Sequence, residues 1–467
     1  MKKHVIPILL CLLLLAGCEK YPEPKGDRAE FDAFVAGVDA ARAANTEWTQ
    51  EEKALFETYT PDISDQADTL TQEELDELFT AKEVERVSRE EALKDIDLFF
   101  RLLKSAYGGY DVHGRDETFF AAREEVLSHF TEDKDYTVSE LKKYLENALS
   151  PFVRDGHFAI GEKRVLKDEQ YMYYVPGVYF NDTTGLDTDY VKPTIGPDGA
   201  LTYCFAALSA RRISLPKQIG AYQDLDWVKA EPLKNVKRVA YHRTAERGIT
   251  ILQCRTMDTT AQWRGQLEQL ASSGADYRGL PTFLIDIRRN GGGGETSGSR
   301  WVEGFTGEAP VVKQADAWKF SAAFEAWQSS EECERVGGDA IRSLLPQGAA
   351  GTWKASQTDG KRTDSDSVVF VLTDRNTASA AEGFLYDLRT VNQVVTVGSN
   401  TAGCTISGNR ITYYLPHSGI KTAFGLSFGF RETADNIEGV GILPDLWVNP
   451  VDAQDAVLRL IDYYGLR

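Results

Sequence analysis

The chain has 467 residues, of which 42% are hydrophobic, so it is long enough for two or three domains and apolar enough for a full core. Its 52 basic and 71 acidic residues give a formal net charge of −19. This negative surplus argues against nucleic acid as a partner and against adsorption onto acidic lipid headgroups, because both are negatively charged.

Residues 1–17 have the pattern of a lipoprotein signal peptide. Two lysines precede an apolar run, residues 5–15, which is too short to span a bilayer as a helix. The run ends in Leu-Ala-Gly-Cys, which resembles a bacterial lipobox and implies cleavage before Cys18 and lipidation of that cysteine. The resemblance also implies an outer-membrane destination, because the residue after the cysteine is Glu19 and not an aspartate. We therefore expect a lipid anchor in the bacterial cell envelope, on the outer membrane or a periplasm-facing membrane; a plain signal peptide is the alternative.

Residues 18–87 predict a polar tether followed by short acidic helices. Two prolines lie near the start of this segment, and capping boxes that begin at Thr49 and Thr71 mark the starts of the helices. The segment therefore predicts a stalk or a small cap ahead of the main domains.

Residues 88–165 predict a small N-terminal helical bundle that ends at a histidine. A capping box at Ser88 precedes a helix with one apolar face, and two further helices follow near residues 117–130 and 137–149. They lead to His157, which stands after a polar turn at the edge of a predicted strand. Histidine supplies a general base near neutral pH, and the alternative is a structural histidine that ends the strand.

Residues 166–247 predict a β-rich inserted subdomain near the mouth of the active site. The segment is rich in tyrosine, glycine and proline and has short strand-like runs. It shows no carboxylate-binding Gly-Leu-Gly loop, so we do not predict a PDZ domain.

Residues 248–467 alternate between predicted strands and helices, which indicates an α/β domain. One apolar strand ends at Asp286 and is followed by four glycines, residues 291–294. Glycines let the backbone approach a ligand and turn its N–H groups toward it. The run lacks the lysine-serine pair of a P-loop and the spaced glycines of a dinucleotide fold, so we interpret it as part of an oxyanion hole. Asp286 and Arg288 are interpreted as an internal ion pair or loop brace.

A small-residue turn, residues 376–382, places Ser379 between an apolar strand at residues 368–373 and a helix that begins at Ala380. Unpaired N–H groups and the positive end of the helix dipole stabilise a negative oxygen at such a position. Small residues at a strand-to-helix turn also serve packing, which is the alternative. Glu382 is interpreted as a carboxylate favoured by the first helical turn.

Taken with residues 437–445, these segments resemble the C-terminal processing (tail-specific) serine peptidases over about residues 88–165 and 248–450. The processing proteases proper use a lysine downstream of the serine as general base. At the corresponding offset this chain has Cys404, so a serine-lysine mechanism is unavailable. The chain instead resembles the branch that includes the tricorn core protease and the repeats of interphotoreceptor retinoid-binding protein, which has a Ser-His-Glu arrangement.

The resemblance implies Ser379 as nucleophile, His157 as its base and Glu438 as the carboxylate that orients the imidazole. It also implies an oxyanion hole formed by the N–H groups of Ala380 and Gly292. We therefore expect His157 within about 3 Å of both Ser379 and Glu438. The implied fold class is α/β, a crotonase/ClpP-like β-β-α spiral catalytic domain preceded by the helical bundle.

The chain departs from this branch immediately before the histidine. In the tricorn core protease a serine at that place is thought to assist the histidine, whereas here the residue is Gly156. The helper role is therefore not carried over to this chain.

The function implied is an exported, lipid-anchored serine endopeptidase that cleaves peptides or unfolded protein ends through an acyl-enzyme on Ser379. We expect no cofactor and no metal, because the chain has no His-Glu-x-x-His motif. The cysteines after the signal show neither CxxC nor zinc-ligand spacing, so no disulfide is claimed. They are Cys204, Cys254, Cys333 and Cys404.

Two alternatives remain open from the sequence. The first is a noncatalytic lipoprotein that keeps the fold and binds peptides or apolar ligands. The second is an esterase, although the Gly-x-Ser-x-Gly elbow is absent. The oligomeric state stays open as well.

Overall fold

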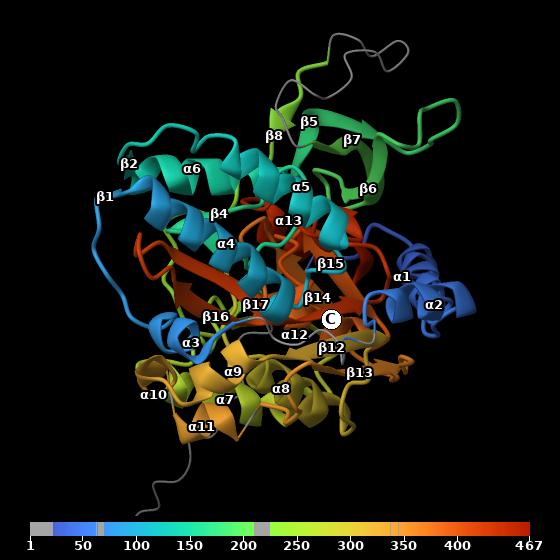
Figure 1. Ribbon diagram of the computed structural model, residues 1–467. Helices are drawn as coiled ribbons and strands as arrows, with labels where there is room; N and C mark the ends of the chain where they lie inside the picture. The colour runs from blue at the N-terminus through green and yellow to red at the C-terminus, as the bar shows by residue number, and fades with distance from the viewer. Residues whose placement is uncertain (1–21, 62, 64–69, 210–224, 337, 344) are drawn as a thin grey trace, which may run out of the picture.

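The computed structural model describes residues 22–61, 63, 70–209, 225–336, 338–343 and 345–467 (Figure 1). The predicted signal peptide and Cys18 lie outside these residues. Within the described ranges, none of the helices combines the length and the apolar character needed to cross a bilayer.

One six-stranded sheet has the strand order β18-β15-β14-β11-β10-β9 and is parallel except at β9. Every residue of its central strands β11 and β14 is buried, as expected for parallel strands that are covered on both faces. The strands are β9 (His242–Glu246), β10 (Ile249–Gln253), β11 (Thr282–Asp286), β14 (Val368–Thr373), β15 (Val394–Gly398) and β18 (Leu446–Trp447).

Alternate residues of these strands enter two separate hydrophobic clusters, because successive side chains of a strand point to opposite faces. Phe283 and Val371 pack with α7 (Arg264–Ser272), α8 (Thr296–Thr306) and α12 (Ala380–Arg389). Leu284 and Phe370 pack on the other face with α1 (Arg28–Ala43) and α13 (Ala453–Tyr464). The 3₁₀ helix η2 (Gly274–Tyr277) links α7 to β11. The sheet therefore forms the central layer between two sets of helices.

A second sheet carries the chain segment that follows His157. Its order is β13-β12-β17-β3-β4, and β16 pairs with β17. The short strand β3 pairs antiparallel with the long strand β17, which fixes the position of the histidine just before it. The strands are β3 (Ala159–Ile160), β4 (Lys163–Arg164), β12 (Gln314–Phe320), β13 (Thr352–Thr358), β16 (Ser407–Tyr414) and β17 (Lys421–Arg431).

Helices from the region of residues 88–165 pack on this second sheet. Leu103 of α4 and Leu145 of α6 share a hydrophobic cluster with Phe424 of β17. The predicted capping box at Ser88 begins α4. The helices are α4 (Arg89–Ala106), α5 (Arg115–Leu127) and α6 (Val138–Leu149), and α9 (Ala322–Gln328), α10 (Glu331–Val336) and α11 (Asp339–Arg342) follow later in the chain. A two-stranded sheet joins β1 (Arg86–Val87) to β2 (Tyr136–Thr137).

The interval 166–247 contributes to two sheets. Four antiparallel strands form a sheet of order β6-β7-β5-β8: β5 (Tyr171–Phe180), β6 (Val191–Ile195), β7 (Leu201–Ser209) and β8 (Val228–Lys229). β9, which we placed in the inserted subdomain, instead pairs with β10 of the parallel sheet. The sheet of the insert thus ends at β8.

The segment predicted as a tether contains a docked helix, α1. Phe31 and Val35 lie four residues apart, so they share one helix face and are buried against the parallel sheet. α2 (Gln50–Thr58) and α3 (Gln72–Glu77) follow, and each begins at its predicted capping box. α1 therefore belongs to the folded body rather than to a tether.

Candidate active site

Ser379 lies at the turn between β14 and α12, and its backbone is strained. Its φ of +55° and ψ of −123° lie in a region that residues with a Cβ atom seldom adopt. The turn is anchored from both sides, because Thr377 Oγ1 donates to the carbonyl of Ile287 (3.1 Å) and the Ala378 N–H donates to the carbonyl of Asn290 (2.9 Å). Strain held in this way places the serine side chain at the N-terminus of a helix, half-buried.

A buried carboxylate, Glu382, holds this strained residue in place. It is fully buried, and its two oxygens accept four hydrogen bonds. Oε2 accepts the N–H groups of Ser379 (2.9 Å) and Cys404 (2.9 Å). Oε1 accepts the Thr401 hydroxyl (2.5 Å) and the Gly403 N–H (2.7 Å). Our interpretation of Glu382 as a first-turn carboxylate missed this second set of partners, because no sequence pattern joins α12 to residues 401–404.

His157 approaches Ser379 directly. Its Nε2 lies 3.2 Å from Ser379 Oγ, and its backbone N–H donates to Asp155 Oδ1 (2.7 Å). Burial lowers the pKa of His157, and the neighbouring Asp155 partly offsets this effect. A neutral imidazole can accept the serine proton, so the pair has the geometry and the charge state of a nucleophile and its base.

Glu438 has no hydrogen bond to His157 among the described residues, so the predicted approach of its carboxylate to the imidazole is wrong. The carboxylate is fully buried and accepts three backbone N–H groups, from Gly156 (2.5 Å), Ile406 (2.6 Å) and Thr405. Within the described part of the chain it has no hydrogen bond to the imidazole. Burial, followed by repulsion from Asp155, raises the pKa of Glu438. Glu438 therefore joins the turn before His157 to the segment before β16 instead of orienting the ring directly.

The side chain beside His157 Nδ1 is Cys404, the residue at the lysine offset. Its Sγ lies 3.4 Å from Nδ1 and 3.6 Å from Nε2. Cys404 is only 3% exposed, and burial, followed by the charge of Glu438, raises the pKa of its thiol. The thiol thus stays protonated at neutral pH.

Asp155 is a second residue that sequence reasoning missed. It is fully buried, and in addition to the His157 N–H it accepts the hydroxyls of Ser407 (2.8 Å) and Tyr107 (2.8 Å). Tyr107 Oη lies 3.2 Å from Nδ1 of His113. The run Asp155-Gly156-His157 carried a signal for it, because an aspartate side chain in a turn commonly accepts the backbone N–H two residues along.

The two predicted oxyanion donors differ in availability. The Ala380 N–H has no hydrogen-bond partner among the described residues. Gly292 lies beside Ser379, since a Cβ atom on it would stand 2.8 Å from Ser379 Cβ and 2.9 Å from Ala380 N. Its own N–H, however, donates to Asn290 Oδ1 (3.0 Å). Gly292 therefore provides the close backbone approach that we predicted, while its N–H is already in use.

Asp286 and Arg288 form an internal ion pair, in line with our interpretation. Arg288 Nε lies 2.8 Å from Asp286 Oδ1, and Arg255 Nη2 lies 2.5 Å from Oδ2 of the same carboxylate. All three side chains are buried. The four cysteines after the signal are buried as free thiols.

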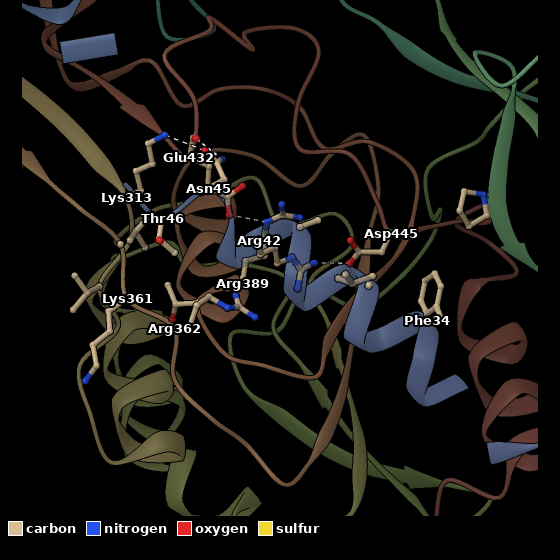
Figure 2. Close-up of a pocket in the computed structure, with 18 of the residues that line it drawn as sticks. Phe34, Arg42, Asn45, Thr46, Lys313, Lys361, Arg362, Arg389, Glu432 and Asp445 are labelled. Atoms are coloured by element: carbon tan, nitrogen blue, oxygen red, sulfur yellow. Dashed lines mark hydrogen bonds and ion pairs between the residues drawn. The ribbon is translucent and has the colours of Figure 1, made fainter. Parts of the chain in front are cut away.

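A cavity of about 530 Å³ lies beside α1, and Ser379 and His157 do not line it (Figure 2). Five cationic side chains line this cavity, and each has a carboxylate partner. Arg42, for example, pairs with Asp445 (2.5 Å). The other four pairs are Lys313–Glu52, Lys361–Glu308, Arg362–Asp39 and Arg389–Glu432. Two of these pairs, Arg42–Asp445 and Arg362–Asp39, join α1 to the rest of the fold.

Comparisons with known proteins give one family match. Residues 248–448 match the model of Peptidase family S41. One similar solved structure is mature CPAF, with 14% sequence identity and a TM-score of 0.43; the match covers 81% of this chain and 95% of that chain. Another is the photosystem II D1 C-terminal processing protease, with 15% identity and a TM-score of 0.37; this match covers 79% of this chain and 96% of that chain. A lipoprotein from Streptococcus agalactiae is also similar, with 13% identity and a TM-score of 0.37; the match covers 80% of this chain and 95% of that chain. A comparison with curated proteins found no match.

The matched segment contains the glycine run, Ser379 and Glu438, while His157 lies before it. The match therefore covers the nucleophile side of the site, and the second sheet brings the histidine to it. Residues 248–448 therefore match Peptidase family S41, a family of serine-type C-terminal processing peptidases.

Proposed function

We propose that the chain cleaves peptide bonds through an acyl-enzyme on Ser379. The 3.2 Å contact between Ser379 Oγ and His157 Nε2 carries this proposal. In the first step Oγ attacks the scissile carbonyl carbon while its proton passes to Nε2. The same nitrogen then gives the proton to the leaving amine. Water, activated by His157, releases the acyl group and restores the serine.

The electrostatics around the pair support these steps. Burial lowers the pKa of His157, so that the ring is neutral at pH 7 and able to accept a proton. The Ala380 N–H, which has no partner within the described ranges, stands at the start of α12 and supplies a donor for the oxyanion. One such donor is worth about a hundred- to a thousandfold in rate.

Glu438 acts in this mechanism as a brace. Its carboxylate accepts hydrogen bonds from Gly156 and from residues 405 and 406. These bonds hold the turn that carries His157 at a fixed distance from the segment that carries Cys404. We thus propose that this chain belongs to the Ser-His-Glu branch, and that its Glu438 supports His157 through hydrogen bonds to backbone N–H groups rather than through a bond to the imidazole.

The substrate is proposed to be a peptide or an unfolded protein end. The crotonase-like spiral is likewise a proposal, supported by the order of the parallel strands and by the helices between them. We also propose that the protein is exported and anchored in the cell envelope through Cys18, on the strength of the lipobox-like run at residues 15–18. The anchor is tested by Cys18→Ala, which should release the protein from washed membranes; a variant that stays in the membrane fraction contradicts it.

The activity is tested with a fluorophosphonate probe on the soluble chain that starts after Cys18. We expect a label on Ser379, located by mass spectrometry, that disappears in Ser379→Ala and His157→Ala. A folded wild-type chain that takes up no label would favour the noncatalytic binding lipoprotein. Hydrolysis of a small ester without cleavage of any peptide in a mixed library would favour the esterase.

A further inference from the structure

The cavity beside α1 has no part in the proposed mechanism, since neither Ser379 nor His157 lines it (Figure 2). Its volume of about 530 Å³ lies within the range of small-molecule sites in proteins. α1 and the segment before β12 give the cavity an apolar wall, which consists of Ala33, Phe34, Val38, Ala41, Val311 and Val312. A ligand with an apolar body can therefore be buried there.

The charges that face this cavity are mainly positive. Five cationic side chains line it, but only two of their carboxylate partners, Glu432 and Asp445, line it as well. The other three partners, Asp39, Glu52 and Glu308, stand outside the lining. A ligand in the cavity therefore meets more positive than negative groups, although every one of the cations is paired.

Three of these cations are guanidinium groups that lie close together, as Figure 2 shows. Arg362 Nη1 donates a hydrogen bond to the backbone carbonyl of Arg389. Burial lowers the pKa of Arg42 to about 10, against the attraction of Asp445. Arg389 and Arg362 act in the same direction as burial, because like charges repel. An anion placed among the three guanidinium groups relieves this repulsion.

Arg389 is the guanidinium with hydrogen-bond donors to spare. Its Nε donates to Glu432 Oε1 (2.9 Å), and within the described ranges its two Nη groups have no hydrogen-bond partner. The Nη groups of Arg42 and Arg362, in contrast, are engaged by backbone carbonyls and side-chain oxygens. A guanidinium fork of this kind matches the two oxygens of a carboxylate. Arg389 is therefore the group best suited to hold an anionic head.

α1 leaves open space in the cavity at Gly37. This residue lines the cavity, and a Cβ atom built on it would meet nothing within 4 Å. Gly37 is the only glycine of α1 and lies in the helix interior, where glycine is less favourable than alanine. The helix thus keeps room beside its apolar wall at a cost to its own stability.

We propose that this cavity binds an organic carboxylate with an apolar body. The carboxylate accepts hydrogen bonds from the two Nη groups of Arg389, and the apolar body lies along α1 beside Gly37. Two sources supply this chemistry: a free aliphatic acid, and the carboxyl end of a peptide whose last residue is apolar. The proposal does not depend on catalysis by Ser379, because that residue stands outside the cavity.

Isothermal titration calorimetry tests the binding with the chain that starts after Cys18. The protein carries Ser379→Ala, so that no probe is cleaved. The probes are octanoate and the peptide N-acetyl-Ala-Leu with a free carboxyl group, and their amides are the uncharged controls. We expect at least one carboxylate to bind, and its amide to bind about tenfold more weakly or less, because the amide loses charged hydrogen bonds.

The pattern of binding identifies the source of the carboxylate. Binding of octanoate alone assigns the cavity to a free acid, and binding of the peptide alone assigns it to a peptide end. If neither carboxylate binds, or if each binds no better than its amide, the proposal is overturned. A chain that binds a carboxylate but takes up no fluorophosphonate loses only the proposed catalytic function.

Variants of two cationic residues locate the carboxylate in the cavity. Arg389→Lys keeps the charge beside Glu432 but removes the planar fork, so it should weaken binding by about tenfold. Lys361→Gln removes a charge from the same cavity, but this side chain is 60% exposed, so binding should weaken by less than about threefold. Equal losses in the two variants mean that the ligand senses only the overall charge, and they overturn the contact with Arg389.

A substitution at Gly37 keeps the proposal testable if Arg389→Lys does not fold. Gly37→Trp places an indole ring in the cavity and should abolish the binding of both probes. Gly265→Trp is the matched control, because Gly265 belongs to α7, has no atom within 4 Å of a built Cβ atom and does not line the cavity. A Gly37→Trp protein that folds by circular dichroism and binds the probes as tightly as Gly265→Trp overturns the proposal.

Discussion

Replacement of Glu382 by glutamine tests how the nucleophile is held. The substitution keeps the size of the side chain and turns one of two acceptor oxygens into an N–H₂ donor. Each oxygen accepts two hydrogen bonds in the wild-type protein. The amide can place its N–H₂ group at Oε1, where the Thr401 hydroxyl can rotate to accept from it. The Gly403 N–H is then left facing a donor.

The expected magnitude follows from that single orphaned group. One buried backbone donor without a partner costs about 1–3 kcal/mol, so Glu382→Gln should lower the free energy of unfolding by about that amount. The opposite amide orientation orphans the N–H groups of both Ser379 and Cys404 and is about twice as costly. The fluorophosphonate labelling rate of Ser379 should fall as well, because the strained backbone relaxes.

Denaturant unfolding followed by tryptophan fluorescence measures the stability change. Glu90→Gln is the matched control, since Glu90 pairs with Lys94 at 2.8 Å and its side chain is 79% exposed. The control should stay within about 0.5 kcal/mol of the wild-type protein. If Glu382→Gln is no more destabilising than Glu90→Gln, the four hydrogen bonds do not hold the site and the reasoning is refuted.

Three further predictions concern pH, backbone space and α1. Because burial lowers the pKa of His157, the labelling rate of Ser379 should rise with pH through a midpoint below the ordinary value of 6.5, and a midpoint above 6.5 contradicts this. Folding also favours the neutral ring, so this histidine should make the protein less stable as pH falls through 6.5. Gly292→Ala should abolish labelling, because its Cβ atom would stand 2.8 Å from Ser379 Cβ and because φ at this position is +93°. Gly291→Ala is the control: its Cβ atom would have no other atom within 4 Å, so Ser379 should be labelled normally. Equal labelling rates in the two variants would count against the close approach of Gly292 to Ser379. Asp445→Asn leaves the buried Arg42 without its charged partner and should lower the free energy of unfolding, measured with denaturant, by about 3–5 kcal/mol. Asp32→Asn removes the partner of Arg28 in an exposed pair and should lower it by less than about 1 kcal/mol. Similar losses in the two aspartate variants would show that the charges beside α1 do not fasten the helix.

Local signals in the sequence predicted much of the secondary structure around the site. The capping boxes at Thr49, Thr71 and Ser88 start helices as predicted, because a capping box needs only residues within one turn. The apolar run before Ser379 is the buried strand β14, and α12 begins at Ala380. α1 was assigned to a tether, since a single docked face with Phe31 and Val35 is a weak signal in a polar segment.

The sequence by itself determined the order of the motifs, the type of each candidate group and the absence of a lysine at the expected offset, because these are properties of residues and of their spacing. The tertiary structure decided which groups meet. Glu438 reaches Gly156 across 282 residues instead of the imidazole, and Glu382 reaches Gly403 across 21. A buried carboxylate accepts hydrogen bonds from whichever N–H groups the fold places around it. The reason is that a buried N–H or carboxylate oxygen without a partner costs more free energy than a single hydrogen bond contributes. That choice depends on how two sheets and α12 pack, and it therefore lies beyond any local pattern.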